Sequence, residues 1–121
     1  MTLRSEIVGI GVLDAGWVTF PIKLKSGMKD ESGDDLLGCV CFDKNEIYLE
    51  TKQDPRIMRR TLLHECLHVL LSTSGVKHPD EDVHVPLSVT NEFITEQMTR
   101  GLFLLRRLNP ELWAIIFEED E

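Results

Sequence analysis

The chain of 121 residues lacks several features that would assign it to a particular class of protein. It has no apolar run of about 18 residues and no basic-then-apolar N-terminus, which argues against a membrane span and a signal peptide. Its three cysteines, an odd number, do not form a disulfide framework and suit a reducing cytoplasm. Positive charge is also scarce, and the net charge of −8 argues against nucleic acid as the main ligand. We therefore expect a cytoplasmic protein that binds neither membranes nor nucleic acid.

Composition and patterning predict one globular domain over residues 1–121. Hydrophobic content of 42% and charged content of 28% are ordinary for such a domain. Strands are predicted at 6–13, 17–24 (where Pro21 indicates an edge or a bulge), 37–42 and 46–50, the last two forming a hairpin. Helices are predicted at 55–73, 88–108 and 110–117. Strands first and helices later predict the α+β class, with a small, mainly antiparallel sheet of three to four strands packed on the two long helices.

The most informative motif is His64-Glu65-Cys66-Leu67-His68, inside the first long helix. Residues four apart lie on one face of a helix, so His64 and His68 can present two imidazole nitrogens to one metal ion. Glu65 lies about 100° round the helix, where its carboxylate can take a proton from water at the metal. This pattern is the His-Glu-x-x-His signature of zinc metallopeptidases.

The surrounding sequence predicts that this helix is central and buried. Residues 61–71 are apolar almost all round, Asp54-Pro55 suits a helix start, and Gly75 suits a stop. Histidines inside such a helix are costly unless something satisfies them. The alternative to a metal site is that they are hydrogen-bonded core residues.

Two histidines leave a catalytic zinc one protein ligand short. The metzincin pattern is excluded, because it needs Gly and His where this chain has Leu71 and Ser74. Glu92, on the second long helix, is the preferred third ligand. Glu96 lies one turn further on the same face, where it could accept the second ring N–H of a ligand histidine. Alternatively, the two glutamates form a solvated helix stripe.

The motif followed by Glu92-Phe93-Ile94-Thr95-Glu96 resembles the gluzincin metallopeptidases, in which a Glu-x-x-x-Asp/Glu on the next helix completes the site. The length and the preceding strands are similar to the minimal gluzincins, such as the ImmA/IrrE-like and SprT-like groups and small phage-encoded relatives. The resemblance covers roughly residues 37–108. It implies a zincin-like fold, Zn²⁺ held by His64, His68 and Glu92, Glu65 as general base, and Glu96 supporting a ligand. Larger gluzincins often have Asp in place of Glu96.

The same resemblance implies a protein or peptide substrate, such as a repressor or another regulator. In gluzincin-like folds an edge strand beside the cleft pairs with an extended substrate, which implies this role for the strand at 46–50. A residue that stabilises the tetrahedral oxyanion is also expected. The sequence does not choose between the candidates, which are Tyr48, His78, His84 and Arg100.

Other readings remain open. Cys39 and Cys41 alternate on a strand and would share a face, so with the histidine motif they resemble the ligand set of peptide deformylases. Cys66 is expected to face away from the metal, in the core. A zinc-binding interaction module with little turnover is the main alternative function. A metal-dependent ribonuclease of the three-histidine type fits poorly with the acidic charge and with Glu65.

Overall fold

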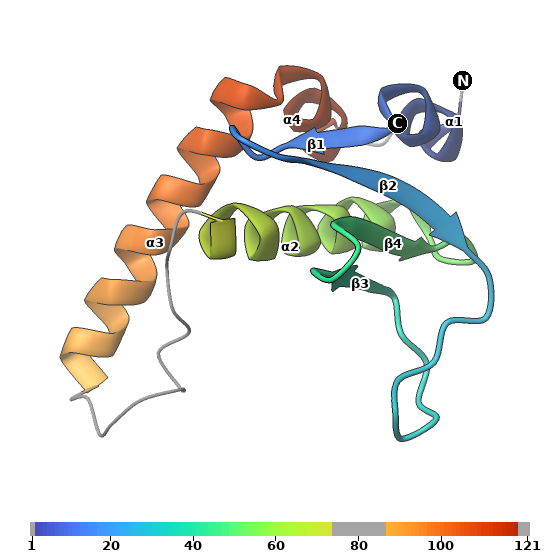
Figure 1. The fold of residues 1–121 in the computed structure, drawn as a ribbon, viewed down its shortest axis with the longest axis horizontal. Helices are drawn as coiled ribbons and strands as arrows, with labels where there is room; N and C mark the ends of the chain where they lie inside the picture. The colour runs from blue at the N-terminus through green and yellow to red at the C-terminus, as the bar shows by residue number, and fades with distance from the viewer. Residues whose placement is uncertain (1, 74–86, 119–121) are drawn as a thin grey trace.

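The computed structural model describes residues 2–73 and 87–118 (Figure 1). The chain is of the α+β class, as predicted, with four helices and a four-stranded sheet in the described part. The elements follow in the order α1 (Leu3–Ile10), β1 (Val12–Asp14), β2 (Thr19–Lys25), β3 (Gly38–Cys41), β4 (Glu46–Glu50), α2 (Pro55–Thr73), α3 (Leu87–Leu108) and α4 (Pro110–Ile116). None of the described helices combines the length and the apolar character needed to cross a membrane.

The predicted first strand at 6–13 is wrong over most of its length, because Leu3–Ile10 forms the helix α1. Thr2 and Ser5 cap this helix reciprocally, each side chain accepting from the other's backbone N–H. Leu3 and Ile7, four residues apart, are the buried pair. Gly11 then ends the helix with a left-handed φ of 71°, which glycine adopts without strain. Only the last residues of the predicted strand join the sheet, as β1.

The sheet has the strand order β1-β2-β4-β3 and is mixed: two of its three strand pairings are antiparallel, as predicted for a mainly antiparallel sheet, and one is parallel. The hairpin of β3 and β4 is confirmed, and β1 also pairs with β2 antiparallel. The central pair, β2 and β4, is parallel, because the chain between them crosses back instead of turning tightly. Pairing with β4 starts at Ile22, so Pro21 lies where β2 pairs only with β1, and its missing N–H interrupts no ladder.

Among the described strands, β3 forms the edge of the sheet near α2, whereas the predicted edge strand at 46–50 is β4, an inner strand. The order of the sheet puts β4 between β2 and β3, so its backbone groups are paired on both sides. Any strand that joins the sheet on this side must therefore pair with β3.

One face of the sheet packs on α2 to form the core. Ile22, Ile47 and Leu49 point into it from the strands, and Met58, Leu62 and Cys66 from the helix. At the end of α2, a Cβ at Gly101 would lie only 2.8 Å from Leu67 Cδ2, so this glycine lets α3 pack closely against α2. The core thus fixes α2 between the sheet and α3 (Figure 1).

Candidate metal centre

Helix α2 positions the His-Glu-x-x-His motif and is well defined at its start. Asp54 accepts a hydrogen bond from the Arg56 backbone N–H at 2.9 Å, and Pro55 occupies the first helical position. The predicted span of 55–73 is confirmed. The helix is not buried all round, however, because His64, His68 and Ser72 form an exposed stripe at intervals of four residues.

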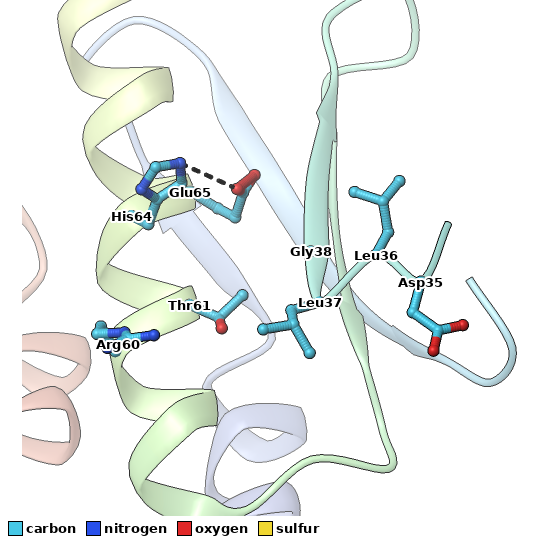
Figure 2. A pocket seen from close by; sticks show the side chains of 8 residues that line it. All are labelled: Asp35, Leu36, Leu37, Gly38, Arg60, Thr61, His64 and Glu65. Carbon is cyan, nitrogen blue, oxygen red and sulfur yellow. Dashed lines mark ion pairs between the residues drawn. The ribbon is translucent and has the colours of Figure 1, made fainter. Parts of the chain in front are cut away.

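A pocket of about 440 Å³ is lined by this helix and by the residues at the start of β3 (Figure 2). The helix contributes Arg60, Thr61, His64 and Glu65, which we call the helical wall. Residues 35–38 form the opposite side, which we call the strand wall. Leu37 points from the strand wall toward α2 and faces Thr61, and His64 and Glu65 lie one turn further along the helix.

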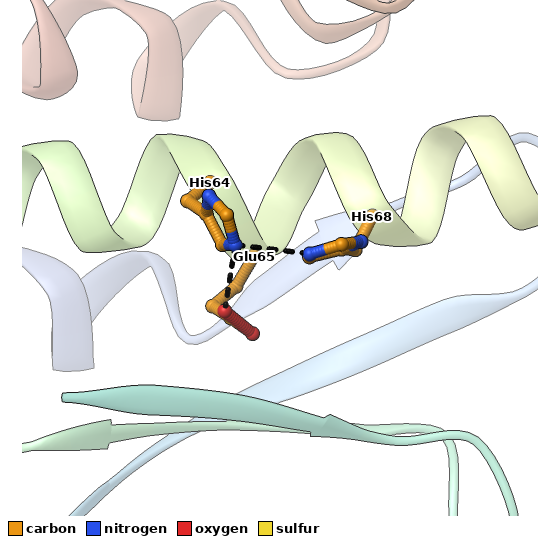
Figure 3. Close-up of side chains that lie close together, drawn as sticks. All are labelled: His64, Glu65 and His68. Carbon is orange, nitrogen blue, oxygen red and sulfur yellow. Dashed lines mark hydrogen bonds and ion pairs between the residues drawn. The ribbon is translucent and has the colours of Figure 1, made fainter. Parts of the chain in front are cut away.

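The two histidines of the motif lie on the exposed side of α2 with their rings turned toward each other (Figure 3). Their Nε2 atoms are 2.9 Å apart. Two imidazoles on one tetrahedral zinc, with bonds of about 2.0–2.1 Å, would have nitrogens about 3.3 Å apart. The separation has to widen by only a few tenths of an ångström for both nitrogens to bind one ion, which would replace the hydrogen bond between them. Their exposure also contradicts the reading in which they are hydrogen-bonded core residues.

Glu65 lies beside the two histidines but, unlike them, is buried. Its Oε1 atom is 3.9 Å from His64 Nε2, and the residue is only 6% exposed. Burial raises the pKa of the Glu65 carboxyl, and the neighbouring His64 opposes this by favouring the ionised form. His64, Glu65 and His68 have their potential ligand atoms within 4.8 Å of one another, and they are the only such group of three in the described residues.

The close approach of β3 to Glu65 depends on Gly38. A Cβ at this position would lie 2.7 Å from Thr61 Cγ2 and 3.2 Å from Glu65 Cγ. Any side chain here would push the strand away from the helix. Glycine inside a strand pattern is a known sign of such close packing, so this residue could have been singled out from the sequence.

The strand wall is held by hydrogen bonds from residues that sequence reasoning missed. Gln53 Nε2 donates to the carbonyl oxygens of Leu37 at 3.0 Å and Glu50 at 2.7 Å. The Thr61 hydroxyl donates to Gln53 Oε1 at 3.0 Å, so this one amide joins both walls. Glu50 in turn accepts from the backbone N–H groups of Gly27 and Met28. The sequence carries no short-range signal for this network.

The structure does not show the predicted ligand Glu92 or its neighbour Glu96 beside the two histidines. Glu92 lies in the first turns of α3, and its side chain is outside the described part. Glu96 is exposed on α3 and is not part of the histidine group. The third ligand therefore remains a prediction.

The cysteines lie away from the histidines. Along β3, Cys39 and Cys41 alternate with Gly38 and Val40, which face α2. Cys39 pairs across the hairpin with Tyr48. Cys39 and Cys41 therefore face the outer side of the sheet, which does not favour the deformylase-like ligand set. Cys66 is fully buried in the core, as predicted, and burial raises the pKa of its thiol to about 12.

Of the candidates for oxyanion stabilisation, Tyr48 is placed away from the site. It shares the outer face of the sheet with Cys39, and its hydroxyl donates to Glu46 Oε2 at 2.9 Å. Arg100 is exposed on α3 and does not line the pocket. His78 and His84 lie outside the described residues.

Comparisons with known proteins do not assign the chain to a family. No protein-family model matches it, and neither a curated protein nor a solved structure gives a significant match. The function must therefore be argued from the geometry around His64, Glu65 and His68.

Proposed function

We propose that this protein is a zinc-dependent peptidase of the gluzincin type, with a zincin-like arrangement of sheet and helices. The observation that carries the proposal is the convergence of His64 Nε2 and His68 Nε2, 2.9 Å apart, next to the buried carboxylate of Glu65. Two nitrogen donors with an adjacent carboxylate that is not needed as a ligand are typical of hydrolytic zinc sites. A purely structural zinc has no use for such a base.

The residues present fit a zinc ion. His64 and His68 would hold it, and Glu92 from α3 is the proposed third ligand. Zinc in such a site lowers the pKa of water toward about 7 and polarises the substrate carbonyl. Glu65 would accept the proton of the attacking water and then deliver it to the leaving amine. Its raised pKa favours the first of these transfers, because a more basic carboxylate is a better proton acceptor.

The open edge of β3 supports a peptide as the substrate. An extended peptide can add to an exposed strand through backbone hydrogen bonds, which makes recognition largely independent of sequence. The strand begins at Gly38, in contact with Glu65, so a peptide bound along it would pass the motif.

Metal analysis of the purified protein tests the ligand set. We expect about one zinc per chain, lost in His64→Ala and in His68→Ala and retained in Glu65→Gln. Loss of zinc in Glu92→Ala, with retention in Glu96→Ala, would support Glu92 as the third ligand. Full zinc content after His68→Ala would contradict the proposal.

Cleavage of peptide mixtures, followed by mass spectrometry, tests the reaction. We expect products from the zinc-loaded protein and none from zinc-loaded Glu65→Gln, which differs only in the base. A specific observation favours a non-catalytic zinc module as the alternative: of the candidates for oxyanion stabilisation that the structure describes, Tyr48 and Arg100, neither lines the pocket. Fully metallated protein that cleaves no peptide would favour that module.

A further inference from the structure

We propose that Arg60 makes the pocket beside the metal centre a binding site for a carboxylate group of the substrate. This inference rests on the proposed peptidase function and names the chemistry that the enzyme would select. Arg60 lies on the same face of α2 as His64, one turn earlier, and lines the pocket with it (Figure 2).

The arginines of α2 differ in what they contact. Arg59 is largely buried, donates from Nε to the Ile115 carbonyl at 3.1 Å, and lies 4.0 Å from the Glu118 carboxylate. Arg59 thus ties α2 to the C-terminal end of α4. Arg60 is exposed, and within the described part of the chain it has neither an ion-pair partner nor a side-chain hydrogen bond. Its guanidinium group is therefore available to a ligand.

The other charged groups of the pocket are already engaged. Asp35 forms an ion pair with Lys29, and Figure 2 shows its side chain directed away from α2. Glu65 is buried next to His64, at the metal centre. The remaining charge facing the pocket is positive, and a planar guanidinium matches a carboxylate with two parallel hydrogen bonds.

The rest of the pocket suits the aliphatic part of a side chain. Leu37 is 42% exposed, although it is a large apolar residue, and it faces Thr61 across the pocket. A methylene chain placed between them would cover this apolar surface while its carboxylate meets Arg60.

The position of the pocket indicates which part of a peptide would occupy it. The pocket lies at the start of β3, beside Gly38. A peptide paired antiparallel to β3 runs in the opposite direction, so residues following the scissile bond would lie over the pocket. The carboxylate is then either an acidic side chain just after that bond or the free C-terminus of a short substrate.

A binding experiment with the zinc-loaded Glu65→Gln protein separates recognition from turnover. The probes are fluorescein-labelled hexapeptides that differ at one position, Glu, Gln or Lys, each made with a free or an amidated C-terminus. With Arg60 in place, we expect the Glu peptide to bind about fivefold more tightly than the Gln peptide, and this preference to weaken at high salt. If the site binds only the free C-terminus, peptides with a free C-terminus should bind more tightly than their amidated forms, whatever the variable residue. The carboxylate is then that of the chain end.

Variants of Arg60 provide the decisive comparison. Arg60→Gln should abolish the preference, and Arg60→Glu should reverse it toward the Lys peptide. Arg56→Gln, which makes the same change one turn earlier and outside the pocket, should leave it unchanged. Three results would overturn the inference. The first is equal binding of Glu and Gln peptides together with equal binding of acid and amide forms. The others are a preference that survives Arg60→Gln and the absence of binding by any probe.

The outcome is distinguishable from failure of the peptidase proposal. Cleavage by the unmodified protein without any Arg60-dependent preference would reject the carboxylate site and keep the enzyme. Arg60-dependent binding without cleavage would keep the carboxylate site and reject the enzyme.

Discussion

The helical wall and the strand wall of the pocket are built in different ways. The helical wall is part of α2, whose cap, apolar stripe and histidine spacing all lie within one short stretch of sequence. The strand wall has no such local basis, because Leu37 is held by Gln53 and the preceding loop by Glu50. One continuous helix therefore positions His64, Glu65 and His68, whereas the depth and shape of the pocket depend on contacts between residues that are distant in the sequence.

The largest effect should come from the buried back of the helical wall. Leu62 is fully buried against the sheet, so Leu62→Ala should lower the free energy of unfolding by about 3 kcal/mol through lost burial and a cavity. Urea denaturation of the metal-free protein measures this change. Ser72→Ala, on the exposed face of the same helix, should change stability by less than about 0.5 kcal/mol. Similar losses in both variants would mean that α2 does not have two distinct faces.

A smaller effect is expected where the walls meet. Gly38→Ala places a methyl group 2.7 Å from Thr61 Cγ2, so the strand must shift, at a cost of about 2 kcal/mol. Because the shift would move β3 away from Glu65, peptide cleavage should also fall while the zinc content is maintained. Gly9→Ala is the matched control, since a Cβ there meets nothing within 4 Å. A neutral result for Gly38→Ala would show that the close approach is unnecessary.

Removing the amide that joins the walls should cost somewhat less. Gln53→Ala leaves the Leu37 carbonyl and the Thr61 hydroxyl without this partner, and we expect a loss of about 1.5 kcal/mol. Hydrogen exchange should show faster opening at residues 35–38 than in α2. Lys52→Ala, an exposed neighbour, serves as the control. Equal protection of both walls in Gln53→Ala would contradict the role assigned to this amide.

The smallest effect concerns Glu50, and it should depend on pH. Backbone N–H groups of Met28 and Gly27 hold the pKa of the Glu50 carboxyl below its usual value near 4.5. A lowered pKa adds stability at pH values above the usual one, and this contribution is lost as pH falls through the lower folded value. The stability difference between the unmodified protein and Glu50→Gln should therefore narrow in acid. A difference that stays constant between neutral and acid pH would exclude the Glu50 carboxylate as its source. Glu31→Gln, in the loop between β2 and β3 that Glu50 holds, is the control.

Features that depend on local sequence were predicted correctly, whereas features that depend on contacts between distant residues were not. The extent of α2 and the hairpin of β3 and β4 depend on local periodicity, and both are confirmed. The helix α1 was missed because Ile7 to Ile10 are apolar in a way that also fits a strand, and the deciding cap at Thr2 lies outside that stretch. The parallel pairing of β2 with β4 depends on where the whole chain returns, which no local pattern specifies.

The candidate site was predictable only in part for the same reason. The proximity of His64, Glu65 and His68 follows from helical spacing, and the structure confirms it. Their exposure was not foreseen, because the apolar sequence around them gave no indication of which side the sheet and α3 would cover. The roles of Gly38 and Gln53 are tertiary and become visible only once both walls are in place.

The contact between Asn109 and Asp14 has a consequence for self-association. The Asn109 side chain accepts from the Asp14 backbone N–H at 2.7 Å and donates to the Asp14 carbonyl at 2.8 Å, as a neighbouring strand would. The outer rim of β1 is thereby blocked at this point, which protects the protein against sheet-to-sheet aggregation from that end. The opposite rim, at β3, has no such block within the described residues. Among the described strands, the β3 rim is therefore the one left able to pair with a further strand.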